Sequence, residues 1–201
     1  MRLFVLVRHA ESVLNLERRV NGDPTLDVPL TEQGEAEARR LGAQLAHLRL
    51  DACLHTRFPR TQQTAAAALA ERRDEVSVEV EPLLDDLDIG ELEGWTIARY
   101  REWKHTHTRA DRFPGGESLD EAALRYAAAF RKLVAGPASS VLVVTHEIPV
   151  RYALNAAGGS DELDGPAHDI PNATPFLFDA EELERAAFRI EELAAGARVR
   201  A

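Results

Sequence analysis

Cysteine is nearly absent from the 201-residue sequence, in which Cys53 is the only one. A single thiol excludes an internal disulfide and a zinc site built from several thiols, so we expect a reducing, cytoplasmic location. Long apolar runs are also missing. The run at residues 3–7 ends at Arg8 and is far shorter than a membrane span or the apolar part of a signal peptide. We therefore expect no membrane partner and interpret residues 3–7 as a buried strand.

Positive charge is scarce as well. Lysine and arginine number 24 against 34 aspartates and glutamates, which gives a formal net charge of −10 at pH 7. This balance argues against nucleic acid or an anionic membrane as a partner, although it allows a small basic pocket. Hydrophobic residues make up 45% of the chain, which is typical of a globular protein, and the length fits a single domain over residues 1–201. The oligomeric state is not readable from the sequence.

Apolar, β-favouring segments alternate with segments of helical periodicity along the chain. The sequence predicts strands at residues 3–7, 51–55, 76–80, 141–144, 174–178 and 187–192, the last in competition with a helix over residues 181–187. Helices are predicted at residues 31–48, 60–73, 96–104, 118–134 and 148–157. Strands separated by helices predict an α/β protein with three layers, α/β/α, around a mostly parallel central sheet.

Basic side chains and imidazoles follow three of the predicted strands. Arg8 and His9 come directly after the first strand, Arg57 and Arg60 follow the second, and His146 follows residues 141–144. In an open α/β sheet, ligands bind beyond the carboxyl ends of the strands, where helix N-termini add positive potential. The planar fork of arginine suits the oxygens of a phosphate. The sequence therefore predicts a phosphate pocket that contains imidazoles.

Histidines also have simpler interpretations. A single histidine after a strand is more often structural than catalytic. His105 and His107 lie two residues apart, as in a metal pair, but no third ligand is placed convincingly beside them. We expect a solvated loop there and no metal site.

Residues 6–15 read Leu-Val-Arg-His-Ala-Glu-Ser-Val-Leu-Asn. This stretch resembles the opening signature of the histidine phosphatase superfamily, in the branch similar to cofactor-dependent phosphoglycerate mutases. Five further stretches resemble the family's motifs in the same order, at residues 27–34, 56–65, 84–94, 115–118 with Arg125, and 143–146. Six matches in order are a specific signal, and they agree with the independent strand-end argument. The resemblance implies a phosphoglycerate mutase-like fold.

The resemblance also implies roles for individual residues. His9 matches the nucleophile, which forms a phosphohistidine. Arg8 and Arg60 match the guanidiniums that hold the phosphoryl oxygens, and Asn15 matches an amide donor to the same oxygens. His146 matches the imidazole beside the phosphoryl group, where we expect it to be protonated. The mechanism requires no cofactor, and its partner is a small phosphorylated substrate.

The candidate proton donor departs from the family's pattern. Asp86 stands where the family usually has glutamate, and aspartate is shorter and slightly more acidic. Asp86 is still the best candidate, Glu147 is the runner-up, and Asp88 and Glu117 are more remote possibilities. The family's glycine after the nucleophile is replaced by Ala10.

Three further residues are candidates for substrate binding. Arg57 either reaches the substrate or pairs with a surface acid. Asn21 and Gly22 match positions that touch substrate in the mutases, and their alternative is a plain turn.

The first functional hypothesis is a phosphomonoester hydrolase that acts on a small phosphorylated metabolite. A phosphoglycerate mutase is the second hypothesis. It is disfavoured because, compared with the mutases of this family, the stretch after Gly94 is short and lacks their pair of adjacent arginines. A weakly active phosphate-binding or regulatory protein is the third, motivated by Asp86.

Overall fold

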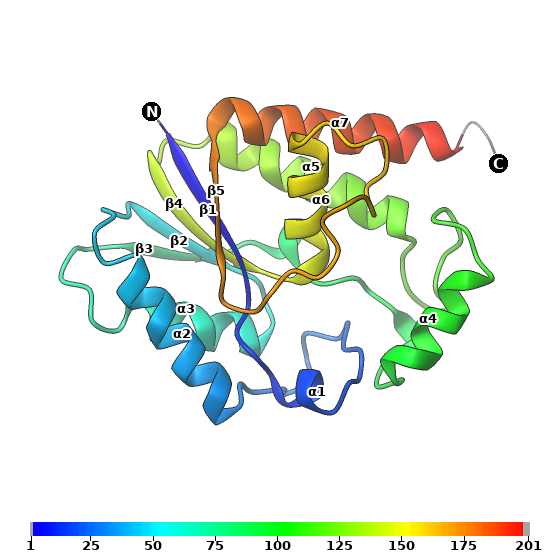
Figure 1. Ribbon diagram of the computed structural model, residues 1–201, viewed down its shortest axis with the longest axis horizontal. Coiled ribbons are helices and arrows are strands. Elements are labelled where there is room, and N and C mark those ends of the chain that lie inside the picture. The colour runs from blue at the N-terminus through cyan, green and yellow to red at the C-terminus, as the bar shows by residue number, and fades with distance from the viewer. Residues whose placement is uncertain (1, 199–201) are drawn as a thin grey trace.

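The computed structural model describes residues 2–198, which form one five-stranded sheet between two layers of helices (Figure 1). The strand order is β3-β2-β4-β1-β5. The first four strands in this order run parallel, and β5 pairs with β1 in the antiparallel direction. This arrangement confirms the predicted three-layer fold with a mostly parallel sheet. The strands are β1 (Leu3–Arg8), β2 (Ala52–His55), β3 (Ser77–Val80), β4 (Ser140–Thr145) and β5 (Pro175–Asp179).

The helices divide between the two faces of the sheet, with α5, α6 and α7 on one side and α2 and α3 on the other (Figure 1). Seven α-helices lie within the described residues: α1 (Val13–Leu16), α2 (Glu32–Gln44), α3 (Pro59–Leu69), α4 (Ile97–His105), α5 (Leu119–Ala135), α6 (Glu147–Ala157) and α7 (Ala180–Arg198). Two short 3₁₀ helices, η1 (Pro82–Leu84) and η2 (Gly90–Leu92), lie between β3 and α4. No helix in the described part of the chain is long and apolar enough to cross a membrane.

The central strands have continuous apolar sequences because both of their faces are covered. Along β1, Phe4 and Leu6 pack under α5, α6 and α7, whereas Val5 and Val7 pack under α2 and α3. All four side chains are buried. The alternation of side chains along a strand thus builds both cores from one short segment and leaves the polar residues after β1 at the edge of the sheet.

Helix caps begin two of the predicted helices where the sequence places them. Thr31 accepts a hydrogen bond from the backbone N–H of Gly34 at the start of α2. At the start of α5, Ser118 and Glu121 form the expected capping box, in which each side chain accepts from the other's backbone N–H.

The predicted strand at residues 187–192 is wrong, because this segment lies inside α7. The buried residues Leu183, Ala187 and Ile190 recur at helical spacing against the sheet, whereas Phe188 is exposed. Asp179 accepts a hydrogen bond from the Glu182 N–H, and the Glu182 carboxylate accepts one from the Asp179 N–H. This reciprocal cap starts a helix that runs through the predicted strand.

Candidate functional site

Two imidazoles meet at the carboxyl ends of neighbouring parallel strands. His9 follows β1 and His146 follows β4, and the backbone N–H of His9 donates to the carbonyl of Thr145 at 2.8 Å. The ring centroids of the two histidines are 5.4 Å apart with an interplanar angle of 65°. Both residues are buried. The strand order therefore brings together two side chains that are far apart in the sequence.

The ring of His9 is fixed with one nitrogen turned to each of two partners. Its Nδ1 lies 2.7 Å from the carbonyl oxygen of Ala10, and because a carbonyl only accepts, Nδ1 carries the proton. The Nε2 lone pair then accepts a hydrogen bond from Nε of Arg60 at 3.0 Å. Burial, followed by the charges of Arg60 and Arg8, holds the pKa of His9 well below its ordinary value. His9 is thus a neutral imidazole in the wall of the cavity, which is the form a nucleophile needs, and its Nε2 lone pair must give up the hydrogen bond from Arg60 before it can attack.

His146 is held on both sides of its ring. Its Nε2 shares a hydrogen bond of 2.9 Å with Oγ1 of Thr56. The Phe58 ring packs edge-on against it, with the ring centroids 4.7 Å apart. Its Nδ1 lies 3.2 Å from Nη2 of Arg60 and 3.3 Å from Oδ2 of Asp86. Burial and the neighbouring Arg60 hold the pKa of His146 well below its ordinary value. The expected protonation of this ring belongs to a phosphoryl-bound site, where the dianion favours the imidazolium.

Arg60 connects the two histidines to the candidate acid. It lies in the first turn of α3, its side chain is 3% exposed, and its guanidinium stacks 4.3 Å from the centroid of the Phe58 ring. Besides its contacts to both imidazoles, it donates to Oδ1 and the backbone carbonyl of Asn21 and, at 2.8 Å, to Oδ2 of Asp86. So many fixed partners leave the planar fork in a single orientation at the cavity.

Arg8 approaches the same cavity from the end of β1. Its Nη1 donates to the carbonyl of Ile170 at 2.7 Å and pairs with Oε2 of Glu147 at 3.2 Å. Its Nε is buried and makes no hydrogen bond within residues 2–198. With Nη1 held by these two groups, the guanidinium of Arg8 is fixed in the wall of the cavity.

Asp86 is the carboxylate placed closest to this pair of rings among the four sequence candidates. Its Oδ1 accepts from the backbone N–H of Leu87 at 3.0 Å, and its Oδ2 faces Arg60 and His146. Burial raises the pKa of Asp86, and the charge of Arg60 partly opposes this. Glu147 also borders the cavity, but its two oxygens are held by Arg8 and Arg151.

A cavity of about 230 Å³ lies beside these groups. Its lining includes Arg8, His9, Asn15, Asn21, Arg60, Asp86 and Glu147, together with residues of α4. The Asn15 carbonyl oxygen Oδ1 accepts from the N–H of Ser12, which leaves the Asn15 amide group available to the cavity. Asn21 has its own Oδ1 occupied by Arg60.

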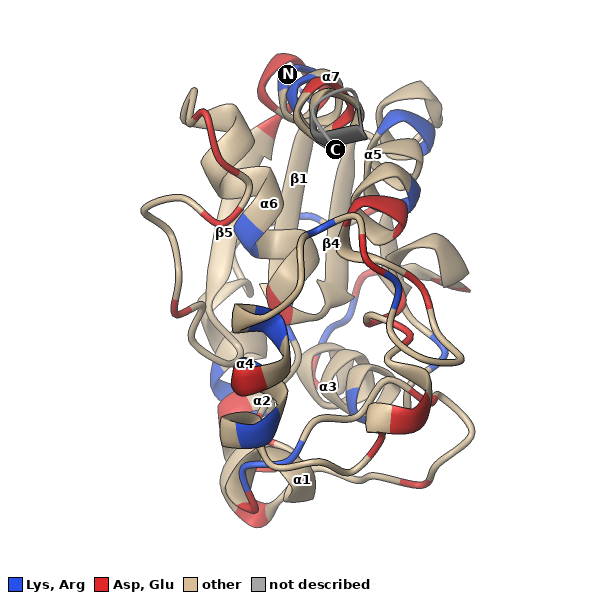
Figure 2. Cartoon of the chain, turned by 90° about the vertical axis from the view of Figure 1, so that its right-hand side faces the viewer, with Lys and Arg blue, Asp and Glu red and all other residues tan. Residues whose placement is uncertain are grey.

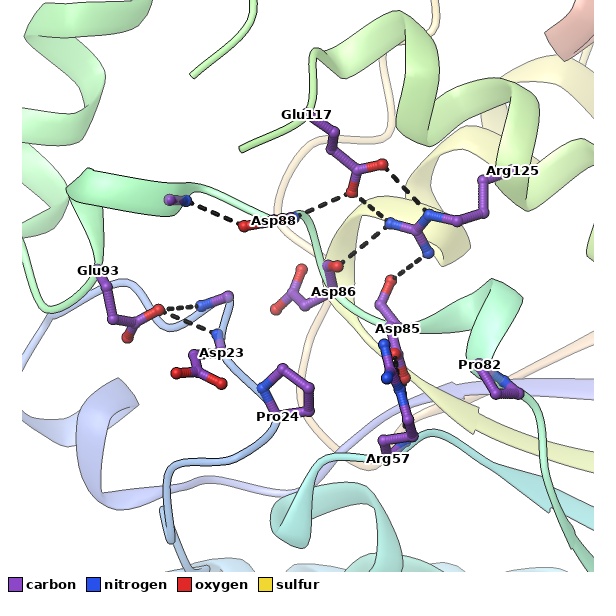
Figure 3. A pocket seen from close by; sticks show the side chains of 12 residues that line it. Asp23, Pro24, Arg57, Pro82, Asp85, Asp86, Asp88, Glu93, Glu117 and Arg125 are labelled. Carbon is purple, nitrogen blue, oxygen red and sulfur yellow. Dashed lines mark hydrogen bonds and ion pairs between the residues drawn. The ribbon is translucent and has the colours of Figure 1, made fainter. Parts of the chain in front are cut away.

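A second cavity, of about 400 Å³, shares Asp86 with the first (Figure 3). It is lined by the other sequence candidates, Gly22, Arg57, Asp88 and Glu117. The structure therefore places these four apart from the two imidazoles. Arg57 forms a 2.5 Å ion pair with Asp85. Arg57 therefore pairs with an acid, as in the second of its two expected roles, but that acid is buried and does not lie on the surface. The N–H of Gly22 donates to Glu93 at 2.7 Å.

Arg125 holds the segment that carries Asp86, a role that the sequence did not reveal. Its guanidinium donates to the carbonyl of Leu83 at 3.0 Å. It also donates to the carbonyls of Asp85 at 3.0 Å and Asp86 at 3.2 Å, and it pairs with Glu117 at 2.5 Å (Figure 3). The sequence motif pairs residues 115–118 with Arg125, but only the fold shows which carbonyls the side chain reaches. Three carbonyls held by one guanidinium fix the backbone next to the candidate acid.

Helix α4 supplies a second group of residues that sequence reasoning missed. Tyr100, Arg101 and Lys104 line the imidazole cavity from one face of this helix, near Arg151 of α6. Figure 2 shows blue segments, marking lysine and arginine, on both α4 and α6. The sequence of this helix contains no motif that is specific for a ligand. After α4, His107 stacks on Trp103 with the ring centroids 3.8 Å apart. No group of three or more potential metal ligands occurs within residues 2–198.

Comparison with known proteins gives a consistent match. The family profile of the histidine phosphatase superfamily (branch 1) matches residues 4–191. A relative named 2,3-bisphosphoglycerate-dependent phosphoglycerate mutase 2, from Gloeobacter violaceus, is 36% identical over 169 residues, which cover 77% of this chain and 74% of the relative. The solved structure of Bacillus stearothermophilus YhfR is 25% identical with a TM-score of 0.75, covering 88% of this chain and 90% of that chain. The alpha-ribazole phosphatase from Shigella flexneri, 21% identical with a TM-score of 0.75 over 88% of this chain and 90% of that chain, is similar in fold.

Proposed function

Because the chain belongs to branch 1 of the histidine phosphatase superfamily, we propose that it is a metal-independent phosphomonoester hydrolase acting through a phosphohistidine on a small phosphorylated metabolite. One observation carries the proposal: the neutral His9 lines a cavity that Arg8 and Arg60 also line, and Arg60 joins His9 to the buried His146. The single thiol of Cys53 favours a reducing, cytoplasmic location, and the net charge of −10 argues against nucleic acid or an anionic membrane as partner.

In the first step, Nε2 of His9 attacks phosphorus and the bond between phosphorus and the ester oxygen breaks. The carboxyl group of Asp86 gives its proton to that leaving oxygen, and its raised pKa keeps this proton available closer to neutral pH. Arg8, Arg60 and a protonated His146 stabilise the charge on the phosphoryl oxygens, which is the main device for phosphoryl transfer.

In the second step, water attacks the phosphorus of the phosphohistidine. The Asp86 carboxylate takes a proton from this water, the bond between Nε2 and phosphorus breaks, and inorganic phosphate leaves. His9 returns to its neutral form, and Asp86 is protonated again for the next turnover.

The mutase hypothesis differs only in the second acceptor. A hydroxyl group of the bound product, instead of water, would take the phosphoryl group from His9. The name of the relative from Gloeobacter violaceus favours this candidate. It predicts that 2,3-bisphosphoglycerate primes the protein and that 3-phosphoglycerate is then converted to 2-phosphoglycerate.

The test is an assay of the pure protein with p-nitrophenyl phosphate and a panel of cellular phosphomonoesters. We expect phosphate release by the wild type, and we expect His9→Ala to lose at least about 10³-fold in kcat/KM while remaining folded. Ordinary turnover in His9→Ala would refute the mechanism. No turnover by the wild type, with phosphate still bound, would identify a binding protein, and isomerisation without net phosphate release would identify a mutase.

A further inference from the structure

Helix α4 presents a mixed aromatic and cationic face to the cavity of His9. Ile97, Tyr100, Arg101 and Lys104 all line this cavity. Positions three, four and seven residues apart lie on the same side of a helix, so the four side chains form one surface. Lys104 is half-buried and Arg101 is exposed. The surface therefore provides two positive charges beyond those that flank the imidazoles.

The other arginines named at the cavity already contact acidic side chains. Arg60 pairs with Asp86 at 2.8 Å, and Arg8 pairs with Glu147 at 3.2 Å. Arg151 is likewise held by Glu147 at 3.3 Å.

Arg101 and Lys104 are different. Within residues 2–198 neither of them makes a hydrogen bond or an ion pair, and the ammonium of Lys104 lies 5.8 Å from the centroid of the Tyr100 ring. Burial lowers the pKa of Lys104, as expected for an ammonium that has lost water without a paired carboxylate. The acid whose charge does most to oppose this, Asp164, is engaged by Arg109 and Arg151. Two cations without partners face a cavity that the proposed function assigns to an anionic substrate.

We propose that Arg101 and Lys104 form a second anion subsite, which selects phosphomonoesters whose alcohol part carries another negatively charged group. This inference rests on the proposed function, and it names the substrate class for the same cavity. The cavity of about 230 Å³ is smaller than a typical drug-sized site of about 300–1,000 Å³, so a phosphoryl group with a short carbon chain is enough to fill it. The favoured substrate is a small metabolite with anions at both ends.

The test uses esters that differ only at the end distant from phosphorus. Phosphate esters of two- to five-carbon chains are compared with a terminal carboxylate, phosphate, hydroxymethyl group or ammonium. At the best chain length, we expect kcat/KM for the carboxylate or phosphate ester to exceed that of the hydroxymethyl ester by about tenfold or more, with the ammonium ester lowest. Preference for the phosphate over the carboxylate end would assign the second group as phosphate. The preference should weaken as salt rises, because the subsite is partly exposed.

The variants test whether α4 causes the preference. In the double variant Arg101→Gln with Lys104→Gln, the ratio of kcat/KM between the anionic and hydroxymethyl esters should fall to about twofold or less. Arg99→Gln is the control for loss of positive charge from the same helix, because Arg99 stacks on Trp95 and does not line the cavity. Arg99→Gln should keep the ratio of the wild type. Equal rates for all four end groups in the wild type, or an unchanged ratio in the double variant, would overturn the inference.

Binding separates this inference from the proposed function. His9→Ala, which should not turn over, is titrated calorimetrically with the same esters, with and without the α4 substitutions. Tighter binding of the anionic esters that depends on Arg101 and Lys104 would support the subsite even if the wild type hydrolyses nothing. Hydrolysis by the wild type without any such preference would keep the phosphatase and reject the subsite.

Discussion

At the scale of single residues, Arg60 joins His9, His146 and Asp86 into one hydrogen-bonded group at the strand ends. Arg8, His9 and His146 can be identified from the sequence because each follows a buried apolar run, and parallel strands end at one edge of the sheet. The partners of Arg60 are not readable, because Asn21 and Asp86 reach it only through loops whose paths depend on the whole fold. The tautomer of His9 likewise depends on the carbonyl of Ala10, which only a folded backbone can aim.

Asp86 offers the sharpest test at this scale. We expect Asp86→Asn to reduce kcat by about 10²-fold for alkyl phosphates, whose leaving oxygen needs a proton. The loss should be only severalfold for p-nitrophenyl phosphate, whose leaving group is stable as an anion. Steady-state kinetics on both substrates measures the difference. For the wild type, the rate on alkyl phosphates should fall as pH rises through the raised pKa of Asp86.

Glu147→Gln is the matched comparison, since Glu147 is the runner-up acid and borders the same cavity. Equal losses on the two substrates in Asp86→Asn, or a selective loss in Glu147→Gln instead, would transfer the role of acid away from Asp86.

At the scale of elements, periodicity and caps predicted the layers of the fold, and one misread period produced the error at residues 187–192. Ala187 and Ile190 fit a short alternating run as well as a helix, and the decisive evidence lay outside that window. The reciprocal cap of Asp179 and Glu182 and the buried Leu183 extend the helical pattern from its start. A short window cannot distinguish the two periods when the apolar residues are few.

Arg125 links α5 to the segment before η2 and provides a prediction at this scale. Arg125→Ala would leave the carbonyls of Leu83, Asp85 and Asp86 and the carboxylate of Glu117 without their shared donor. We expect a loss of about 2–4 kcal/mol in the free energy of unfolding, measured by urea denaturation. Because the backbone of Asp86 is released, kcat for alkyl phosphates should fall more than kcat for p-nitrophenyl phosphate.

Arg125→Lys separates charge from geometry, since lysine keeps the charge but lacks the fork that spans several carbonyls. It should recover only part of the stability and little of the leaving-group selectivity. A stability loss with the two substrates affected equally would assign Arg125 a purely structural role.

At the scale of the whole molecule, the fold places two neutral imidazoles in one buried site despite an acidic surface. The topology made their meeting predictable, because β1 and β4 are neighbours in the sheet and end at the same edge. Their burial was not predictable, since it depends on Phe58, Thr56 and the packing of α3 and α6 around the strand ends. Both pKa values are lowered by this burial, so protonation of either ring favours the unfolded chain.

The free energy of unfolding should therefore depend on pH in a defined direction. Above the ordinary histidine pKa of about 6.5, both rings are neutral in the folded and the unfolded chain, so their contribution is fully present. As pH falls below that value, the unfolded chain takes up protons that the folded chain does not, and each ring lowers the free energy of unfolding by up to about 1.4 kcal/mol per pH unit.

Urea denaturation at pH 7.5 and 5.5 measures this loss for the wild type and for the double variant His9→Gln with His146→Gln. The double variant should lose less over this range by about 1–3 kcal/mol, whereas the exposed His47→Gln should behave as the wild type. Added phosphate should reduce the wild type's loss, because a dianion between the rings favours their protonation in the folded state. Equal losses in all three proteins would show that folding does not lower the pKa of either imidazole, which would contradict the burial argument made for His9 and His146.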